Sequence, residues 1–146
     1  MDVWDVRIDP EESSGVVQIT LELRDGGAKN RITVCPGANY TLSLDEIAWL
    51  EKDIGSFDML LLQLELPTEI IETAARWAYA AQVRVMLNPA PAAPLSDALL
   101  ACVSYLSPNE HEAALLSGRK IRVENGVNMD DIAAAAGFFA DRGVKK

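Results

Sequence analysis

Alternating hydrophobic and polar residues open the chain. Residues 15–24 and 30–35 alternate in part and are rich in β-branched side chains, and the segment between them contains Gly26 and Gly27. Glycine readily takes the positive φ angles of a tight hairpin turn. The start of the chain therefore predicts an antiparallel β-hairpin.

Farther along the chain, short apolar runs alternate with segments of helical periodicity. The apolar runs at 57–65, 83–88 and 103–107 predict strands buried in a sheet. The predicted helices cover residues 43–55, 67–82, 96–101, 107–118 and 129–142. Strands that alternate with helices form parallel sheets through right-handed crossovers. We therefore predict an α/β fold with a Rossmann-like parallel sheet flanked by helices, divided into a hairpin segment at 1–40 and an α/β body at 41–146.

The segment "SPNEHE", residues 107–112, crowds polar groups into the start of one predicted helix. Ser107 is a good N-cap residue, Pro108 suits the first helical position, and Glu110 follows Ser107 by three residues. This spacing predicts that Ser107 and Glu110 form a capping box. Asn109 and Glu112 are then not needed to cap the helix.

Polar side chains follow three of the predicted strands, where a parallel sheet binds its ligands. They are Gln63, Glu65, Asn88, Asn109, Glu110 and Glu112. Asn88 precedes a proline and is better explained as a turn residue. Asn109 and Glu112 share a helix face, where they could order Mg²⁺ with its waters or steer a phosphate. A solvated helix face is the alternative.

Glu65 stands at the end of an apolar run, just before Pro67. An ionised carboxylate partly shielded from water needs hydrogen-bond donors. Sugar hydroxyls would supply them, and backbone amides or an arginine are equally good alternatives. His111 has no serine or cysteine partner in the sequence that would suggest a catalytic triad.

Composition excludes several functional classes. The 146 residues carry a formal net charge of −9, which disfavours binding to nucleic acid or to anionic membranes. The N-terminal residues are charged throughout, unlike a signal peptide, and no apolar run is long enough to span a bilayer. Cys35 and Cys102 lie in apolar contexts without zinc-site spacing and are predicted to be buried and reduced. We expect a cytoplasmic protein.

Four segments, in this order, resemble the ribokinase-like (phosphofructokinase B type) carbohydrate kinases, with ribokinase as the nearest member. They are "NRITVCPGAN", "LLLQLELP", "MLNPAP" and "YLSPNEHEAALLSG". The resemblance implies ATP and Mg²⁺ as cofactors and a sugar as substrate. It implies that Glu65 binds the sugar, that Asn109 lies near the nucleotide phosphates, and that Asn109 and Glu112 form the N-x-x-E motif associated with Mg²⁺. The hairpin resembles the lid of these enzymes, which covers the sugar and in ribokinase also makes a dimer contact.

Departures from the family pattern suggest that this is the central portion of such a kinase. His111 stands where ribokinases commonly have threonine. The family's first segment, with its N-x-D and G-G-x-x-x-N elements, would precede Met1, and the sequence contains no D-T-x-G-A-G-D motif, which supplies the catalytic aspartate. We therefore predict that the isolated chain is inactive and self-associates. A non-catalytic sugar- or nucleotide-binding module and an assembly module are the alternatives.

Overall fold

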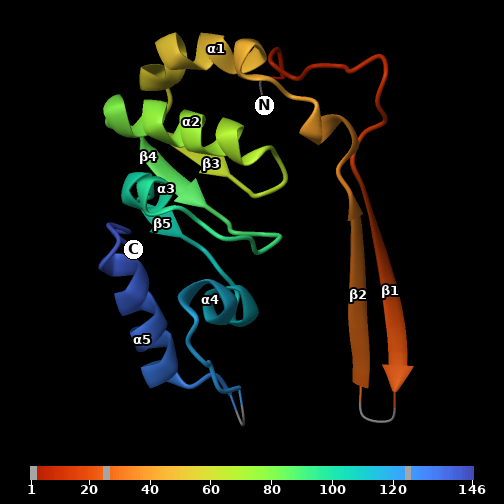
Figure 1. Ribbon diagram of the computed structural model, residues 1–146, viewed down its shortest axis with the longest axis vertical. Helices are drawn as coiled ribbons and strands as arrows, with labels where there is room; N and C mark the ends of the chain where they lie inside the picture. Colours follow the sequence, from red (N-terminus) through yellow and green to blue (C-terminus); the bar gives the residue numbers. More distant parts are fainter. Residues whose placement is uncertain (1–2, 25–26, 124–125) are drawn as a thin grey trace. The chain divides into compact units, whose positions relative to one another are not determined.

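A computed structural model describes residues 3–24, 27–123 and 126–146. The chain separates into two compact units, Met1–Leu42 and Ser43–Lys146 (Figure 1).

The first unit contains the predicted antiparallel hairpin. Strand β1 (Val16–Arg24) pairs with β2 (Gly27–Cys35) in a register that joins Val16 to Cys35. The predicted turn falls partly on Asp25 and Gly26, which lie outside the described residues. Because side chains alternate across a strand, one face of the hairpin carries a row of exposed aliphatic side chains. These include Val17, Ile19, Leu21, Ile32 and Val34.

Close backbone contacts fix the base of the hairpin. The Ala38 amide, in the 3₁₀ helix η1 (Gly37–Tyr40), donates to the Ser13 carbonyl at 2.8 Å. Gly37 has φ +52°, and a Cβ atom there would overlap the Ser13 carbonyl oxygen. The Thr41 hydroxyl donates to Asp9 Oδ2 at 2.6 Å. This bond and the amides of two neighbouring glutamates lower the pKa of the Asp9 carboxyl.

The second unit contains a parallel sheet in the order β3-β4-β5. Its strands are β3 (Met59–Leu62), β4 (Arg84–Leu87) and β5 (Tyr105–Leu106). Its helices are α1 (Leu44–Asp53), the 3₁₀ helix η2 (Ile54–Ser56), α2 (Thr68–Ala80), α3 (Asp97–Cys102), α4 (Glu110–Ser117) and α5 (Met129–Ala140). The predicted α/β class, parallel sheet and N-terminal hairpin are confirmed.

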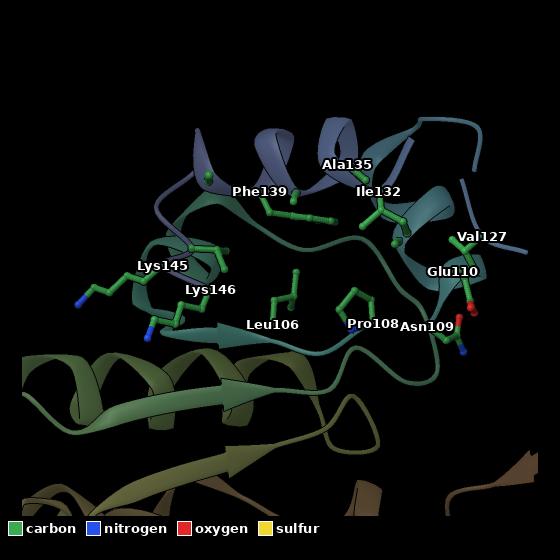
Figure 2. A pocket seen from close by; sticks show the side chains of 14 residues that line it. Leu106, Pro108, Asn109, Glu110, Val127, Ile132, Ala135, Phe139, Lys145 and Lys146 are labelled. Atoms are coloured by element: carbon green, nitrogen blue, oxygen red, sulfur yellow. The ribbon is translucent and has the colours of Figure 1, made fainter. Parts of the chain in front are cut away.

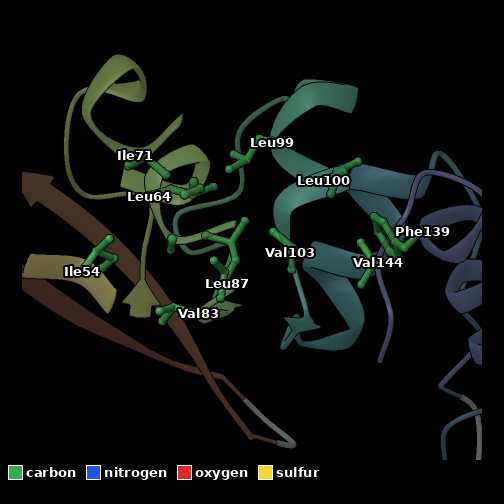
Figure 3. Close-up of a cluster of buried hydrophobic side chains, with 13 residues drawn as sticks. Ile54, Leu64, Ile71, Val83, Leu87, Leu99, Leu100, Val103, Phe139 and Val144 are labelled. Carbon is green, nitrogen blue, oxygen red and sulfur yellow. The ribbon is translucent and has the colours of Figure 1, made fainter. Parts of the chain in front are cut away.

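The central strand β4 organises the core. Val85 and Leu87 are fully buried, and Ile71 of α2 and Val103 after α3 are each 1% exposed (Figure 3). The run at 57–65 contains the predicted strand, β3, but the prediction that this strand is buried in the sheet is wrong. Strand β3 lies at the edge of the described sheet, and Leu61 is 69% exposed.

The cysteines also differ from the prediction. Both are free, but Cys35 is exposed because it ends β2 in the hairpin, and Cys102 is only half-buried at the end of α3. Partial burial raises the pKa of the Cys102 thiol, and this effect outweighs the nearby positive charge of Arg76, which lowers it.

Helix α5 begins as predicted. The Asn128 side chain accepts hydrogen bonds from the amides of Asp130 and Asp131, each at 3.1 Å. Asp131 also accepts from the Arg122 guanidinium through both carboxylate oxygens, at 2.8 and 2.9 Å. The hydrogen bonds from the Arg122 side chain and backbone lower the pKa of the Asp131 carboxyl to about 2. The same bonds tie Arg122 to the first turn of α5.

Candidate functional site at the carboxyl ends of the strands

The carboxyl ends of the three parallel strands lie side by side at the same end of the sheet. Backbone hydrogen bonds continue beyond the strands and tie the following segments together. The Asn88 amide donates to the Leu62 carbonyl at 2.9 Å, and the Ser107 amide donates to the Leu87 carbonyl at 2.9 Å. The segments that carry Glu65, Asn88 and Asn109 therefore all leave the sheet at the carboxyl ends of its strands.

Glu65 does not end a strand, because β3 stops at Leu62. It lies three residues later in the turn before α2 and is half-buried. Within the described residues its carboxylate makes no hydrogen bond or ion pair. The partners that the sequence left open, backbone amides or an arginine, are therefore not found there. The carboxylate is therefore available to accept hydrogen bonds from a ligand.

The predicted cap of α4 is wrong. Asn109, with extended backbone angles, is the N-cap, and Glu112 occupies the third helical position. The Glu112 amide donates to Asn109 Oδ1 at 2.8 Å, and the Asn109 amide donates to Glu112 Oε2 at 2.8 Å. Ser107 forms no capping box with Glu110, because the Ser107 amide that the Glu110 carboxylate would need donates to the Leu87 carbonyl instead.

A third hydrogen bond fixes the two capping side chains to each other. Asn109 Nδ2 donates to Glu112 Oε1 at 2.9 Å. An asparagine amide has two N–H donors, so these bonds leave one of them for another acceptor. The cap thus holds the Asn109 amide and the Glu112 carboxylate in one orientation at the sheet edge, with a helix N-terminus that favours negative charge behind them.

The fit of these residues to Mg²⁺ follows from their donor atoms. Among the described residues there is no cluster of three or more His, Cys, Asp or Glu side chains that could hold a metal ion. Mg²⁺ usually keeps several waters and binds through one or two carboxylates together with substrate phosphates. The oxygens of Asn109 and Glu112 fit such a water-rich ion and do not fit a cage built from protein alone.

The other polar residues of the pattern are less suited to a site. His111 is exposed on the first turn of α4, and Gln63 is exposed after β3. The Asn88 amide continues the sheet by donating to the Leu62 carbonyl, and the Asn88 carbonyl accepts from the Ala90 amide at 2.9 Å. Glu110, one residue into α4, is exposed and takes no part in the cap.

The sequence analysis missed a pocket of about 470 Å³ that lies beside β5, between α4 and α5 (Figure 2). Asn109 and Glu110 reach one end of it. The signal available in the sequence is the unbroken non-polar run at 132–140.

Comparison with known proteins decides the family. Residues 2–146 match the family described as pfkB family carbohydrate kinase. The chain belongs to the pfkB family of carbohydrate kinases. The resemblance inferred from the sequence is confirmed over essentially its whole length.

Relatives of this pfkB chain include ribokinases from a yeast and a bacterium. It is 35% identical over 135 residues to a ribokinase of Schizosaccharomyces pombe, covering 92% of this chain and 41% of that protein. It is 39% identical over 118 residues to a ribokinase of Haemophilus influenzae, covering 81% of this chain and 37% of that protein. The chain therefore spans about two-fifths of the length of these relatives.

A solved structure shares the fold. Arabidopsis thaliana ribokinase, determined in complex with ribose and ATP, superposes with a TM-score of 0.71 at 27% identity, covering 92% of this chain and 41% of that one. None of the helices in the described part of this pfkB chain is both long enough and apolar enough to cross a bilayer.

Proposed function

We propose that this chain is the central portion of an ATP-dependent sugar kinase that phosphorylates a sugar hydroxyl. The observation that carries the proposal is the pfkB family match over residues 2–146. Glu65 and Asn109 both follow the carboxyl ends of strands in this sheet. This placement supports the proposal, because the sugar and the nucleotide must approach each other for direct transfer of the phosphoryl group. The proposal includes a cytoplasmic location. The net charge of −9 disfavours binding to nucleic acid or to anionic membranes.

In this proposal Glu65 accepts hydrogen bonds from sugar hydroxyls. Its carboxylate is half-buried and has no partner among the described residues. A hydrogen bond to a charged group contributes about 1.5–3 kcal/mol. Such a bond selects hydroxyl-bearing ligands and fixes the orientation of the acceptor sugar.

Asn109 and Glu112 act at the phosphate end of the site. The remaining Asn109 N–H donates to a nucleotide phosphate, and Glu112 holds that amide in place through their mutual hydrogen bonds. Their oxygens would orient a hydrated Mg²⁺ that accompanies ATP. When bound, this ion neutralises charge on the phosphates, and the side chains of this chain supply the positioning that dominates phosphoryl transfer.

Calorimetric titration with ribose tests the role of Glu65. We expect Glu65→Gln to weaken ribose binding roughly 10- to 100-fold, the equivalent of one charge-assisted hydrogen bond. Glu69→Gln is the matched control, because Glu69 is an exposed glutamate on the first turn of α2. Equal affinity of the two variants would refute the role of Glu65. Absence of ribose and MgATP binding by the unaltered chain would instead favour the assembly module.

The hairpin carries the second candidate function, an assembly interface. Its exposed aliphatic row, centred on the cross-strand pair Ile19 and Ile32, leaves a hydrophobic face open on a two-stranded ribbon. Such a ribbon has little stability unless its apolar face is covered. We propose that a second copy covers it.

Sedimentation velocity tests this association. We expect the unaltered chain to be at least dimeric at micromolar concentration and Ile19→Lys to shift it toward monomer. Thr20→Lys is the matched control, since Thr20 pairs with Arg31 on the opposite face. A monodisperse monomer of the unaltered chain would contradict the proposal.

A further inference from the structure

A second pocket, the α3–α5 pocket, has a volume of about 330 Å³. It is formed by the segment before α3 together with helices α3, α4 and α5. Its walls are apolar and include Leu95, Leu100, Leu116 and Phe138. The side chains proposed to bind sugar and phosphate do not line this pocket, so it is separate from the candidate site at the strand ends.

Arg142, just after α5, is the one polar side chain among the described residues that line the α3–α5 pocket. Its guanidinium carbon lies 3.7 Å from the centre of the Phe138 ring. Arg142 Nη1 donates to the Phe138 carbonyl at 3.1 Å, and Nε lies 3.1 Å from Asp97 Oδ1 in an ion pair. These three contacts hold the guanidinium in one orientation at the pocket.

Most donors of this guanidinium are unused. A guanidinium carries five N–H donors, and the two contacts above engage the Nε donor and one donor of Nη1. The three others, on Nη1 and Nη2, have no hydrogen-bond acceptor in the part of the chain that the structure describes. Asp97 leaves this end of the fork open, and its own side chain is 80% exposed, where water weakens the ion pair.

We propose that the α3–α5 pocket binds a small amphipathic carboxylate. The carboxylate accepts hydrogen bonds from Nη1 and Nη2 of Arg142, the paired geometry for which a guanidinium is suited. The hydrocarbon part of the ligand lies among the leucine and phenylalanine side chains. The inference is independent of the proposed kinase function, because the two sites share no residue.

The volume of the pocket limits the size of the ligand. Small-molecule sites are mostly apolar clefts of about 300–1,000 Å³ with a few polar groups that fix orientation. At roughly 30 Å³ for each group the size of a water molecule, the α3–α5 pocket has room for about ten non-hydrogen atoms. A monocarboxylic acid of about six carbons meets this limit.

Two other ligand classes use only half of the pocket. A neutral apolar molecule would leave the Arg142 donors without acceptors, and a buried polar group without a partner is costly. A small inorganic anion would pair with Arg142 but would leave the apolar walls in contact with water. A ligand with both a carboxylate and a hydrocarbon chain satisfies both parts.

Titration of the ¹⁵N-labelled chain, followed by nuclear magnetic resonance, tests the ligand class with hexanoate, 1-hexanol and acetate. We expect hexanoate to shift the amide signals of residues 92–100 and 138–142, with a dissociation constant of about 1 mM. Hexanol and acetate should bind at least roughly tenfold more weakly. Equal affinity for hexanol would overturn the role of the charge, equal affinity for acetate would overturn the role of the walls, and no shift with hexanoate would overturn the site.

A set of charge variants identifies the group that holds the carboxylate. Arg142→Gln should weaken hexanoate binding roughly 10- to 100-fold, whereas Arg119→Gln, at an exposed arginine outside the pocket lining, should leave it unchanged. Asp97→Asn removes the same ion pair but also a competing carboxylate, so it should strengthen binding several-fold. If Asp97→Asn weakens binding as much as Arg142→Gln does, the ion pair has only a structural role and the proposal is overturned.

A pair of tryptophan variants identifies the cavity. Ala93 is exposed and lines the pocket, so Ala93→Trp should block it and abolish the hexanoate-induced shifts without disturbing the core. Ala98→Trp, at an exposed position of α3 outside the lining, is the matched control and should bind hexanoate like the unaltered chain. Equal binding by the two tryptophan variants would place hexanoate elsewhere and overturn the proposal.

Discussion

Purified chain 1–146 should form no measurable ribose phosphate from ribose and MgATP. The D-T-x-G-A-G-D motif, which the family resemblance makes the source of the catalytic aspartate and of an anion-binding helix end, does not occur in the sequence. A positioned general base contributes about 10²–10⁴-fold to such reactions, and one donor to the developing charge about 10²–10³-fold. Loss of both lowers the rate by at least ~10⁴.

Ribose-dependent release of ADP, followed in a coupled assay, measures this activity. The ribokinase of Haemophilus influenzae, assayed beside the chain, serves as the positive control. Turnover by chain 1–146 that requires ribose and survives repurification would contradict the prediction. It would also mean that a carboxylate within this chain acts as the base.

Leu87→Ala should destabilise the α/β unit by about 2–5 kcal/mol, the range for large-to-small changes in a packed core. Leu87 is fully buried on the central strand β4, in the core cluster that also contains side chains of α2 and α3. Small domains have total stabilities of about 5–15 kcal/mol, so this loss is a large fraction of the whole. Urea unfolding followed by circular dichroism measures it.

Leu61→Ala is the matched control for that substitution. It removes the same atoms from the neighbouring strand β3, but Leu61 is 69% exposed. Exposed substitutions usually change stability by less than about 0.5 kcal/mol. Equal losses at the two positions would show that β4 is not the centre of the core.

The secondary structure was predictable because its signals are local. Alternation at residues 15–24 and 30–35 predicted the hairpin, and the polar residue Asn128 marked the start of α5. The position of β3 was not predictable. An apolar run such as 57–65 indicates that a segment prefers burial, but the neighbours that cover it belong to the tertiary structure.

The start of α4 shows how a tertiary contact decides between two equal local signals. Ser107 and Asn109 are both good N-cap residues, and each is followed three residues later by a glutamate. Asn109 forms the capping box with Glu112, whereas the Ser107 amide donates to the Leu87 carbonyl of the adjacent strand and is not left for Glu110. The candidate site residues were predicted from strand ends and family motifs, whereas the pocket beside β5 depends on the packing of α4 and α5.

The Asn109–Glu112 pair has a consequence for how such sequences diverge. Each of the two side chains accepts a hydrogen bond from the backbone amide of the other, and together they cap helix α4. A descendant that kept only the fold would still lose helix stability on replacing either residue, so selection for folding alone preserves the N-x-x-E signature. Glu65 has no comparable structural duty among the described residues. If Glu65 binds the sugar as proposed, retention of an acid at that position is the better record of sugar recognition in a lineage.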